Sequence, residues 1–257
     1  MPKKDTSWGG VADWYNELLN STGTYQKELI LPNILRLMDV KEGEWIFDLA
    51  CGQGFFSRKF EEVGANVVGS DISSELIAVA QKTAPKEAYF HVSPSDDISF
   101  EKDESFDKVV CILALQNIEN LIGTMKEAAR ILKKGGRFFI VLNHPAFRNP
   151  KNTSWGFDET TKTQYRRVDA YLSESKTEID MAPGSDPSTK LGASKKVTVS
   201  FHRPLQVYFK ALVKNGFLIG RLEEWNSHKK SEAGPRQKAE DKARQEIPLF
   251  LVIEAIK

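Results

Sequence analysis

The stretch from Trp45 to Ser57 constrains the fold more than any other part of the sequence. It consists of an apolar run that contains Asp48, a turn formed by Gly52-Gln53-Gly54, and then Phe55-Phe56-Ser57. A strand that enters a glycine turn and then a helix is typical of the ligand-binding corner of a parallel α/β sheet, because glycine lets the backbone turn tightly and approach a ligand. The first amides of the helix would direct partial positive charge at that ligand. A tight turn that binds no ligand can have the same short pattern, so residues further along the chain are needed to distinguish the two alternatives.

A second acidic residue lies where a nucleoside ligand would need it. Residues 65–70 predict a second strand that ends at Asp71, roughly 20 residues beyond Asp48. A carboxylate at this position can accept hydrogen bonds from ribose hydroxyls. A dinucleotide site prefers a third glycine, where this sequence has Ser57, and it has no carboxylate before the turn. The pattern therefore favours a nucleoside ligand that lacks a pyrophosphate.

Strand and helix patterns alternate after Trp45 and predict the fold class. Strands are expected over 45–50, 66–70, 88–92, 106–113, 137–142, 217–225 and 248–256, and helices over about 55–63, 73–83, 118–132, 204–214 and 236–245. We therefore expect an α/β fold with a Rossmann-like, seven-stranded, mostly parallel sheet. Its last strand should be antiparallel, and helices should cover both faces.

Two regions fall outside this alternation. Residues 1–44 predict an N-terminal helical cap, in which Pro32 should kink or restart a helix. Residues 145–202 are rich in Gly, Pro, Ser, Thr and Asn and have no convincing period. A structureless loop of that length is uncommon in a compact fold unless it is functional or ordered by contact with the body, so we expect an inserted lid or substrate region over the ligand cleft. The alternation of helix and strand patterns resumes at Arg203 after this insertion. Residues 45–144 and 203–257 should therefore form one domain.

Composition limits the possible partners. The net charge is +1, which predicts no broad nucleic-acid or membrane footprint. Cys51 and Cys111 are expected to be buried apolar side chains, and no metal-ligand spacing is present, so we expect no metal. Without a signal-peptide pattern or an apolar run of about 18 residues, the predicted location is the cytoplasm. The sequence does not indicate the oligomeric state.

Together these motifs resemble class I S-adenosylmethionine-dependent methyltransferases, in the small-molecule branch that includes the ubiquinone and menaquinone biosynthesis enzymes. The Asp48–Gly54 turn and Asp71 match the first two motifs, while Ser105-Phe106-Asp107 and Leu132-Lys133-Lys134-Gly135-Gly136 resemble the entries to strands four and five. The resemblance covers 45–144 by motif and 203–257 by the order of elements. It implies S-adenosylmethionine as cofactor and direct in-line transfer of its methyl group to a small-molecule acceptor.

The resemblance also implies a cofactor site at the carboxyl ends of the first strands. The expected cofactor residues are Asp48, Ala50, Gly52, Gly54, Asp71, Ile72 and Leu113, with Tyr25 and Gln26 closing over from the N-terminal cap. The family commonly has an Asp that binds the adenine amino group, but Pro94 stands at that position here. Either Ser95 or Asp96 is expected to substitute, or backbone groups contact the adenine.

Several residues are candidates for the acceptor side. His144 follows strand five and is the predicted general base, because its ordinary pKa is near neutrality; a local hydrogen bond in the turn is the alternative. Gln116 is expected to line the methyl-transfer point or to cap the next helix. The predicted substrate residues are Tyr15, Tyr165, Arg166 and His202. The Arg166 guanidinium would suit an anionic or aromatic acceptor, although a solvated loop face is also possible.

Two other functions remain open. One is a methyltransferase that acts on RNA or protein, although no Asn/Asp-Pro-Pro-aromatic motif is present and neither cysteine follows a proline. The other is a binding protein that has kept the cofactor site and lost catalysis.

Overall fold

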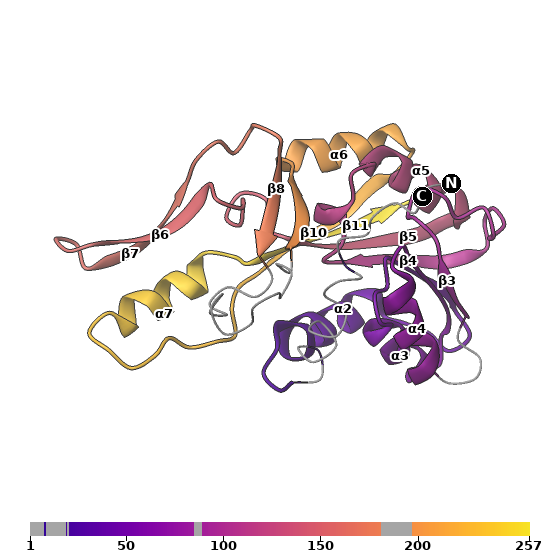
Figure 1. Cartoon of the computed structure of the whole chain (residues 1–257), viewed down its shortest axis with the longest axis horizontal. Coiled ribbons are helices and arrows are strands. Elements are labelled where there is room, and N and C mark those ends of the chain that lie inside the picture. Colours follow the sequence, from indigo (N-terminus) through magenta and orange to yellow (C-terminus); the bar gives the residue numbers. More distant parts are fainter. Residues whose placement is uncertain (1–7, 9–18, 20, 85–88, 181–196) are drawn as a thin grey trace, which may run out of the picture.

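The computed structural model describes Trp8, Leu19 and residues 21–84, 89–180 and 197–257. Its centre is a seven-stranded sheet in the order β10-β11-β5-β4-β1-β2-β3 (Figure 1). The sheet strands are β1 (Trp45–Leu49), β2 (Asn66–Asp71), β3 (Tyr89–Val92), β4 (Phe106–Ile112), β5 (Leu132–Asn143), β10 (Leu218–Trp225) and β11 (Phe250–Ile256). Strands β1 to β5 pair in parallel, whereas β11 is antiparallel to both of its neighbours, β5 and β10. The predicted fold class is confirmed.

Helices cover both faces of this sheet, with α2, α3 and α4 on one side and α5 and α6 on the other (Figure 1). The helical elements are the π-helix η2 (Gln26–Ile30), α2 (Leu31–Met38), α3 (Phe55–Glu61), α4 (Ser74–Thr83), the 3-10 helix η3 (Leu115–Asn117), α5 (Leu121–Ile131), α6 (Leu205–Lys214) and α7 (Gln237–Glu246). Side chains alternate across the strands, so Ile46 packs in the core cluster of α2 and α3 while Phe47 packs in the cluster of α5 and α6. This double covering explains the nearly continuous apolar runs in the central strands.

Two element boundaries differ from the prediction. Strand β5 begins at Leu132 because Phe106 pairs with Leu132 before the register shifts, so the Gly135-Gly136 turn lies inside the strand. Helix α5 begins only at Leu121, since the Asn120 side chain accepts a hydrogen bond from the Gly123 amide and caps the helix there. The expected restart at Pro32 is confirmed, because the π-helix ends at Ile30 and Pro32 lies in the first turn of α2.

The described part of the insertion after β5 is regular, although its sequence showed no convincing period. It contains two antiparallel hairpins, β6 (Thr153–Asp158) with β7 (Thr163–Val168) and β8 (Ser175–Asp180) with β9 (Val197–His202). In β9 the buried positions are the polar residues Thr198, Ser200 and His202. The apolar residues Val197, Val199 and Phe201 alternate with them, so β9 has the period of a strand, but its polar side chains are the buried ones.

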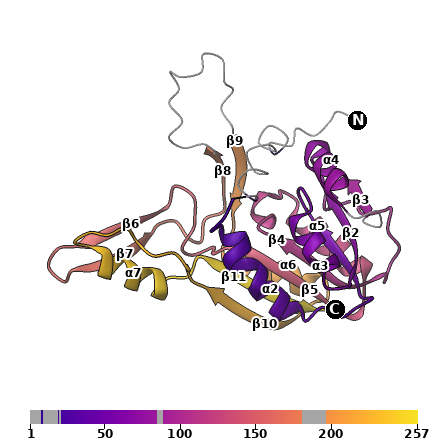
Figure 2. The ribbon, with the colours of Figure 1, turned by 90° about the horizontal axis from the view of Figure 1, so that it is seen from below.

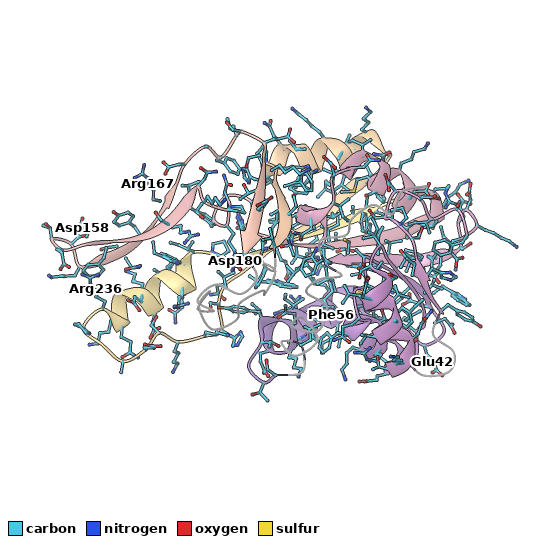
Figure 3. The ribbon with its side chains drawn as sticks, viewed as in Figure 1. Glu42, Phe56, Asp158, Arg167, Asp180 and Arg236 are labelled. Atoms are coloured by element: carbon cyan, nitrogen blue, oxygen red, sulfur yellow. The ribbon has the colours of Figure 1, made fainter. Side chains whose placement is uncertain are left out.

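The β6–β7 hairpin and α7 together form an arm beside the main body (Figures 1 and 2). The Arg236 guanidinium donates a hydrogen bond to Glu159 at 2.5 Å and lies 4.3 Å from the centroid of the Phe157 ring. Figure 3 shows Asp158 near the tip of the hairpin and Arg236 on the neighbouring α7 segment. These contacts position the hairpin relative to the carboxyl edge of the sheet. Across the described residues, no helix is both long and apolar enough to span a bilayer.

Candidate active site

The glycine turn adopts the tight conformation that its sequence predicts. Gly52 and Gly54 have φ angles of 57° and 74°, in the left-handed region that glycine enters without strain. A Cβ atom at Gly54 would also lie 3.0 Å from the Phe90 ring, so the turn packs closely against β3. Ala50 adopts a φ of 58°, which is costly for a residue with a side chain and is found most often at functional sites.

Asp48 is a buried carboxyl group at the end of β1. Its Oδ2 atom accepts a hydrogen bond from the Ser57 hydroxyl at 2.6 Å. Burial raises the pKa of Asp48 to about 7, and the nearby charge of Asp71 adds to this effect, whereas the Ser57 hydrogen bond opposes it. Asp48 therefore changes its protonation state near neutral pH.

Asp71 holds the same corner from β2. Its two carboxylate oxygens accept hydrogen bonds from the Gly52 amide at 3.0 Å and from the Ser73 amide at 2.8 Å. Burial raises the pKa of Asp71, and these amides oppose the shift. Within the described ranges no basic side chain forms an ion pair with Asp48 or Asp71. Two buried carboxyls without a counter-ion provide a favourable site for a cationic ligand.

These carboxyls line a first cavity at the carboxyl ends of β1, β2 and β4. Its wall includes the predicted cofactor residues Asp48, Ala50, Gly52, Asp71, Ile72 and Leu113. It also includes Cys51, which is only partly buried, whereas Cys111 is buried as expected. The sequence prediction omitted the apolar residues Phe55, Ala114 and Ile118, which also line it. Their signal was available, since each directly follows a predicted strand or turn.

The remaining predicted cofactor residues lie elsewhere. Gly54 forms the N-cap of α3 but is not in the cavity wall. The Ser95 hydroxyl lies 2.8 Å from that of Thr124, and Asp96 accepts a hydrogen bond from Asn120 at 2.7 Å. Both residues thus connect the loop before β4 to the start of α5, and neither lines the first cavity. The positions of Ser95 and Asp96 therefore do not support the predicted contact with adenine.

A second, larger cavity of about 600 Å³ adjoins the first. Leu113 and Asn117 line both cavities, and so does Trp8. The second cavity contains the predicted residues Gln116 and Arg166, together with Tyr25 and Gln26, which had been assigned to the cofactor. The β6–β7 and β8–β9 hairpins supply part of its wall through Trp155, Arg166, Thr198 and Ser200. Its size is typical of a small-molecule site.

Gln116 lines this cavity, and only one end of its side-chain amide is hydrogen-bonded. Its side-chain amide donates to the Leu113 carbonyl at 2.5 Å, while its Oε1 atom is buried and has no hydrogen-bond partner among the described residues. A buried acceptor without a partner carries a desolvation penalty. A bound molecule with an O–H or N–H group could remove that penalty.

His144 does not line either cavity. Its Nε2 atom lies 2.7 Å from the Glu224 carboxylate, and its Nδ1 atom accepts a hydrogen bond from the Ala146 amide at 3.2 Å. Burial lowers the pKa of His144, against the effect of Glu224. With both ring nitrogens occupied by the protein, the geometry favours the local structural role over the predicted general base.

The other predicted substrate residues are also placed apart from the large cavity. Tyr165 pairs with Gly156 in the β6–β7 hairpin and is half exposed, outside the cavity wall. The Nε2 atom of His202 lies 2.8 Å from the Tyr171 carbonyl, and the residue borders a small neighbouring pocket. Tyr15 lies outside the described residues. No group of three or more His, Cys, Asp or Glu residues that could hold a metal occurs within the described ranges.

The parallel sheet, the left-handed glycine turn and the two buried carboxyls define a nucleoside-binding α/β domain. Comparisons with known proteins make this assignment specific. Residues 47–140 match the model of the family described as "Methyltransferase domain". The chain also resembles the structure of an S-adenosylmethionine-dependent methyltransferase from Mesorhizobium loti, with a TM-score of 0.70 and 24% identity over 91% of this chain and 100% of that one.

Curated relatives are also named as methyltransferases. A demethylmenaquinone methyltransferase of Tropheryma whipplei is 31% identical over 43% of this chain and 46% of its own length. A ubiquinone biosynthesis O-methyltransferase of Xanthomonas oryzae pv. oryzae is 30% identical over 38% of this chain and 42% of its own length. The match therefore spans less than half the length of these relatives. Residues 47–140 thus match a methyltransferase-domain family, and the fold is that of the S-adenosylmethionine-dependent methyltransferase that the chain resembles.

Proposed function

We propose that this protein is an enzyme that transfers a methyl group from S-adenosylmethionine to a small-molecule acceptor. The observation that carries the proposal is the meeting of the two cavities at Leu113 and Asn117. The smaller cavity contains the carboxyls suited to a cationic nucleoside, and the larger one has space for a second molecule. Methyl transfer requires this arrangement, because the acceptor and the sulfonium methyl group must be in line and in contact.

The proposed roles follow from position. Asp71 would accept hydrogen bonds from the ribose, and Asp48 would favour the cationic cofactor from within the turn. Gln116 would accept a hydrogen bond from the acceptor's O–H or N–H group through its unpartnered Oε1 atom. The cofactor, when bound, would supply an electrophilic methyl group, and its transfer to the acceptor would release S-adenosylhomocysteine and pass the acceptor's O–H or N–H proton to solvent. Orientation and exclusion of water would supply most of the rate.

The names of the relatives suggest which acceptors to test first. Both relatives are named for quinone biosynthesis, so hydroxylated quinone precursors are the first candidates. The family model ends at residue 140, before the insertion that forms part of the acceptor cavity here. The acceptor of this protein can therefore differ from theirs. A cytoplasmic location remains a prediction.

Calorimetric titration with S-adenosylmethionine, S-adenosylhomocysteine and NAD tests the cofactor site. We expect micromolar binding of the first two ligands and no binding of NAD. Asp71→Ala should weaken binding of S-adenosylhomocysteine about tenfold or more, because charge-assisted hydrogen bonds are lost. Asp96→Ala is a matched control outside the cavity and should leave the affinity nearly unchanged. Equal effects of the two variants, or a failure of both sulfur nucleosides to bind, would contradict the assigned site.

A further inference from the structure

The larger cavity has a marked imbalance of charge. Arg148, Lys151, Arg166 and Arg244 line it, and the described part of its wall contains no Asp or Glu. The whole chain has 36 basic and 35 acidic residues, so the excess of basic residues in the cavity wall does not reflect the charge balance of the chain. A cavity with walls of one charge concentrates ligands of the opposite charge.

The Arg148 guanidinium forms no hydrogen bond or ion pair with the described residues. Its guanidinium carbon lies over the Phe250 ring, 5.9 Å from the ring centroid, which is a weak cation–π contact. Its side chain is accessible through the cavity, yet enough protein surrounds it for burial to lower its pKa. A guanidinium in this position would gain most from an anion entering the cavity.

Arg166 is held beside it in a fixed orientation. Its guanidinium donates hydrogen bonds to the Phe147 carbonyl at 2.9 Å and to the Thr153 hydroxyl at 2.6 Å. It also lies 5.1 Å from the centroid of the Trp155 ring, the residue opposite it in the hairpin. The charge of Arg148 and burial both lower the pKa of Arg166. The two cations therefore repel each other across the cavity, and a bound anion would relieve that repulsion.

We infer that the methyl acceptor is a small molecule with an anionic group, either a carboxylate or a phosphate, bound by Arg148 and Arg166. This inference rests on the proposed function, because it assigns the acceptor to the cavity beside the cofactor site. Apolar residues of the same wall, including Phe147, Trp155 and Leu249, would contact the uncharged part of the molecule. Arg166 would then have the anion-binding role that its sequence context suggested, whereas Arg148 was not predicted.

Paired probes test the inference in protein saturated with S-adenosylhomocysteine. Each pair consists of an anion and a neutral analogue: 4-hydroxybenzoate with 4-hydroxybenzamide, and phenyl phosphate with phenol. Calorimetry should show at least one anion binding about tenfold or more tightly than its neutral analogue, as expected for charge-assisted hydrogen bonds. The pair with the larger difference distinguishes carboxylate from phosphate.

Arg148→Gln should abolish this preference, and it removes no described hydrogen bond. Arg167→Gln is the matched control, since Arg167 follows Arg166 in β7 but pairs with Asp169 outside the cavity. Absence of an anion preference in both pairs, including absence of binding at millimolar concentration, would overturn the inference. So would a preference that survives in Arg148→Gln, or tight binding of a single-stranded RNA oligonucleotide that depends on Arg148. Failure of S-adenosylhomocysteine to bind would instead contradict the proposed function.

Discussion

At the scale of single residues, the cofactor corner depends on carboxyl groups that the protein does not neutralise. Asp48 and Asp71 are buried, and their compensation comes from the Ser57 hydroxyl and from backbone amides. Hydrogen bonds of this kind only partly offset the loss of hydration. Burial thus disfavours the charged form of these carboxyls, and a cationic ligand would stabilise that form.

Asp48→Asn should make the stability of the free protein less sensitive to pH. The pKa of Asp48 is raised to about 7, so the folded state keeps a proton that the unfolded state has already lost. Its stabilising contribution is complete below the unfolded pKa and is lost as the pH rises through 7. Asn preserves an oxygen that can accept the Ser57 hydrogen bond.

Urea unfolding at several pH values from about 5 to 8.5 measures this effect. The free energy of unfolding of wild type should fall relative to that of Asp48→Asn as the pH rises, with a slope approaching about 1.4 kcal/mol per pH unit below pH 7 and levelling off above pH 7. A constant difference between the two proteins across this range would show that Asp48 does not titrate there.

At the scale of elements, β2 brings the glycine turn and β3 together. Gly69 pairs with Asp48 on one side and with Phe90 on the other. A Cβ atom at Gly69 would lie 2.7 Å from the Phe90 ring and 2.9 Å from the Cys51 sulfur. The small residue therefore permits close packing between a core aromatic ring and the wall of the cofactor cavity.

Gly69→Ala should destabilise the fold by about 1–3 kcal/mol, the usual effect of overpacking. It should also weaken S-adenosylhomocysteine binding, because relief of the clash moves the Cys51 segment. Gly234→Ala provides the control, since no atom lies within 4 Å of a Cβ at that exposed position. Thermal unfolding and calorimetry would contradict this account if both variants behaved like wild type.

At the scale of the whole molecule, the acceptor cavity depends on contacts between distant parts of the chain. The Asn117 side chain, from the segment after β4, donates a hydrogen bond to the Val199 carbonyl of β9 at 2.7 Å. Arg203 donates another to the Glu119 carbonyl at 2.7 Å. These bonds attach the inserted β8–β9 hairpin to the edge of the sheet where the two cavities meet.

Asn117→Ala should therefore loosen the inserted hairpin more than the cofactor site. Loss of one such hydrogen bond is worth about 1 kcal/mol, enough to increase amide exchange in residues 197–202 several-fold. Hydrogen–deuterium exchange measures this change, and calorimetry should find S-adenosylhomocysteine affinity altered less than about threefold. Asn33→Ala removes a side-chain bond to the Leu29 carbonyl and is the control. Unchanged exchange in 197–202 would show that Asn117 does not hold the hairpin.

The sequence by itself determined the sheet, the glycine turn and the position of both carboxyls. These features depend on local geometry and on burial of regular apolar patterns, which nearby residues encode. Asp48, Asp71 and Leu113 therefore reach the cavity as their motifs predict. The boundaries of β5 and α5 were less predictable, because cross-strand pairing and a side-chain cap decided them.

Only the tertiary structure decided the acceptor side. In β9 the polar side chains are buried and the apolar ones only partly so, an orientation that the alternating sequence could not reveal. His144 directly follows β5, yet contacts with Glu224 and Ala146 occupy its ring nitrogens. Arg148 had no motif to reveal it, and it faces the cavity because residues far apart in the sequence enclose the same space. Such long-range packing is a property of the folded chain as a whole, which no local pattern encodes.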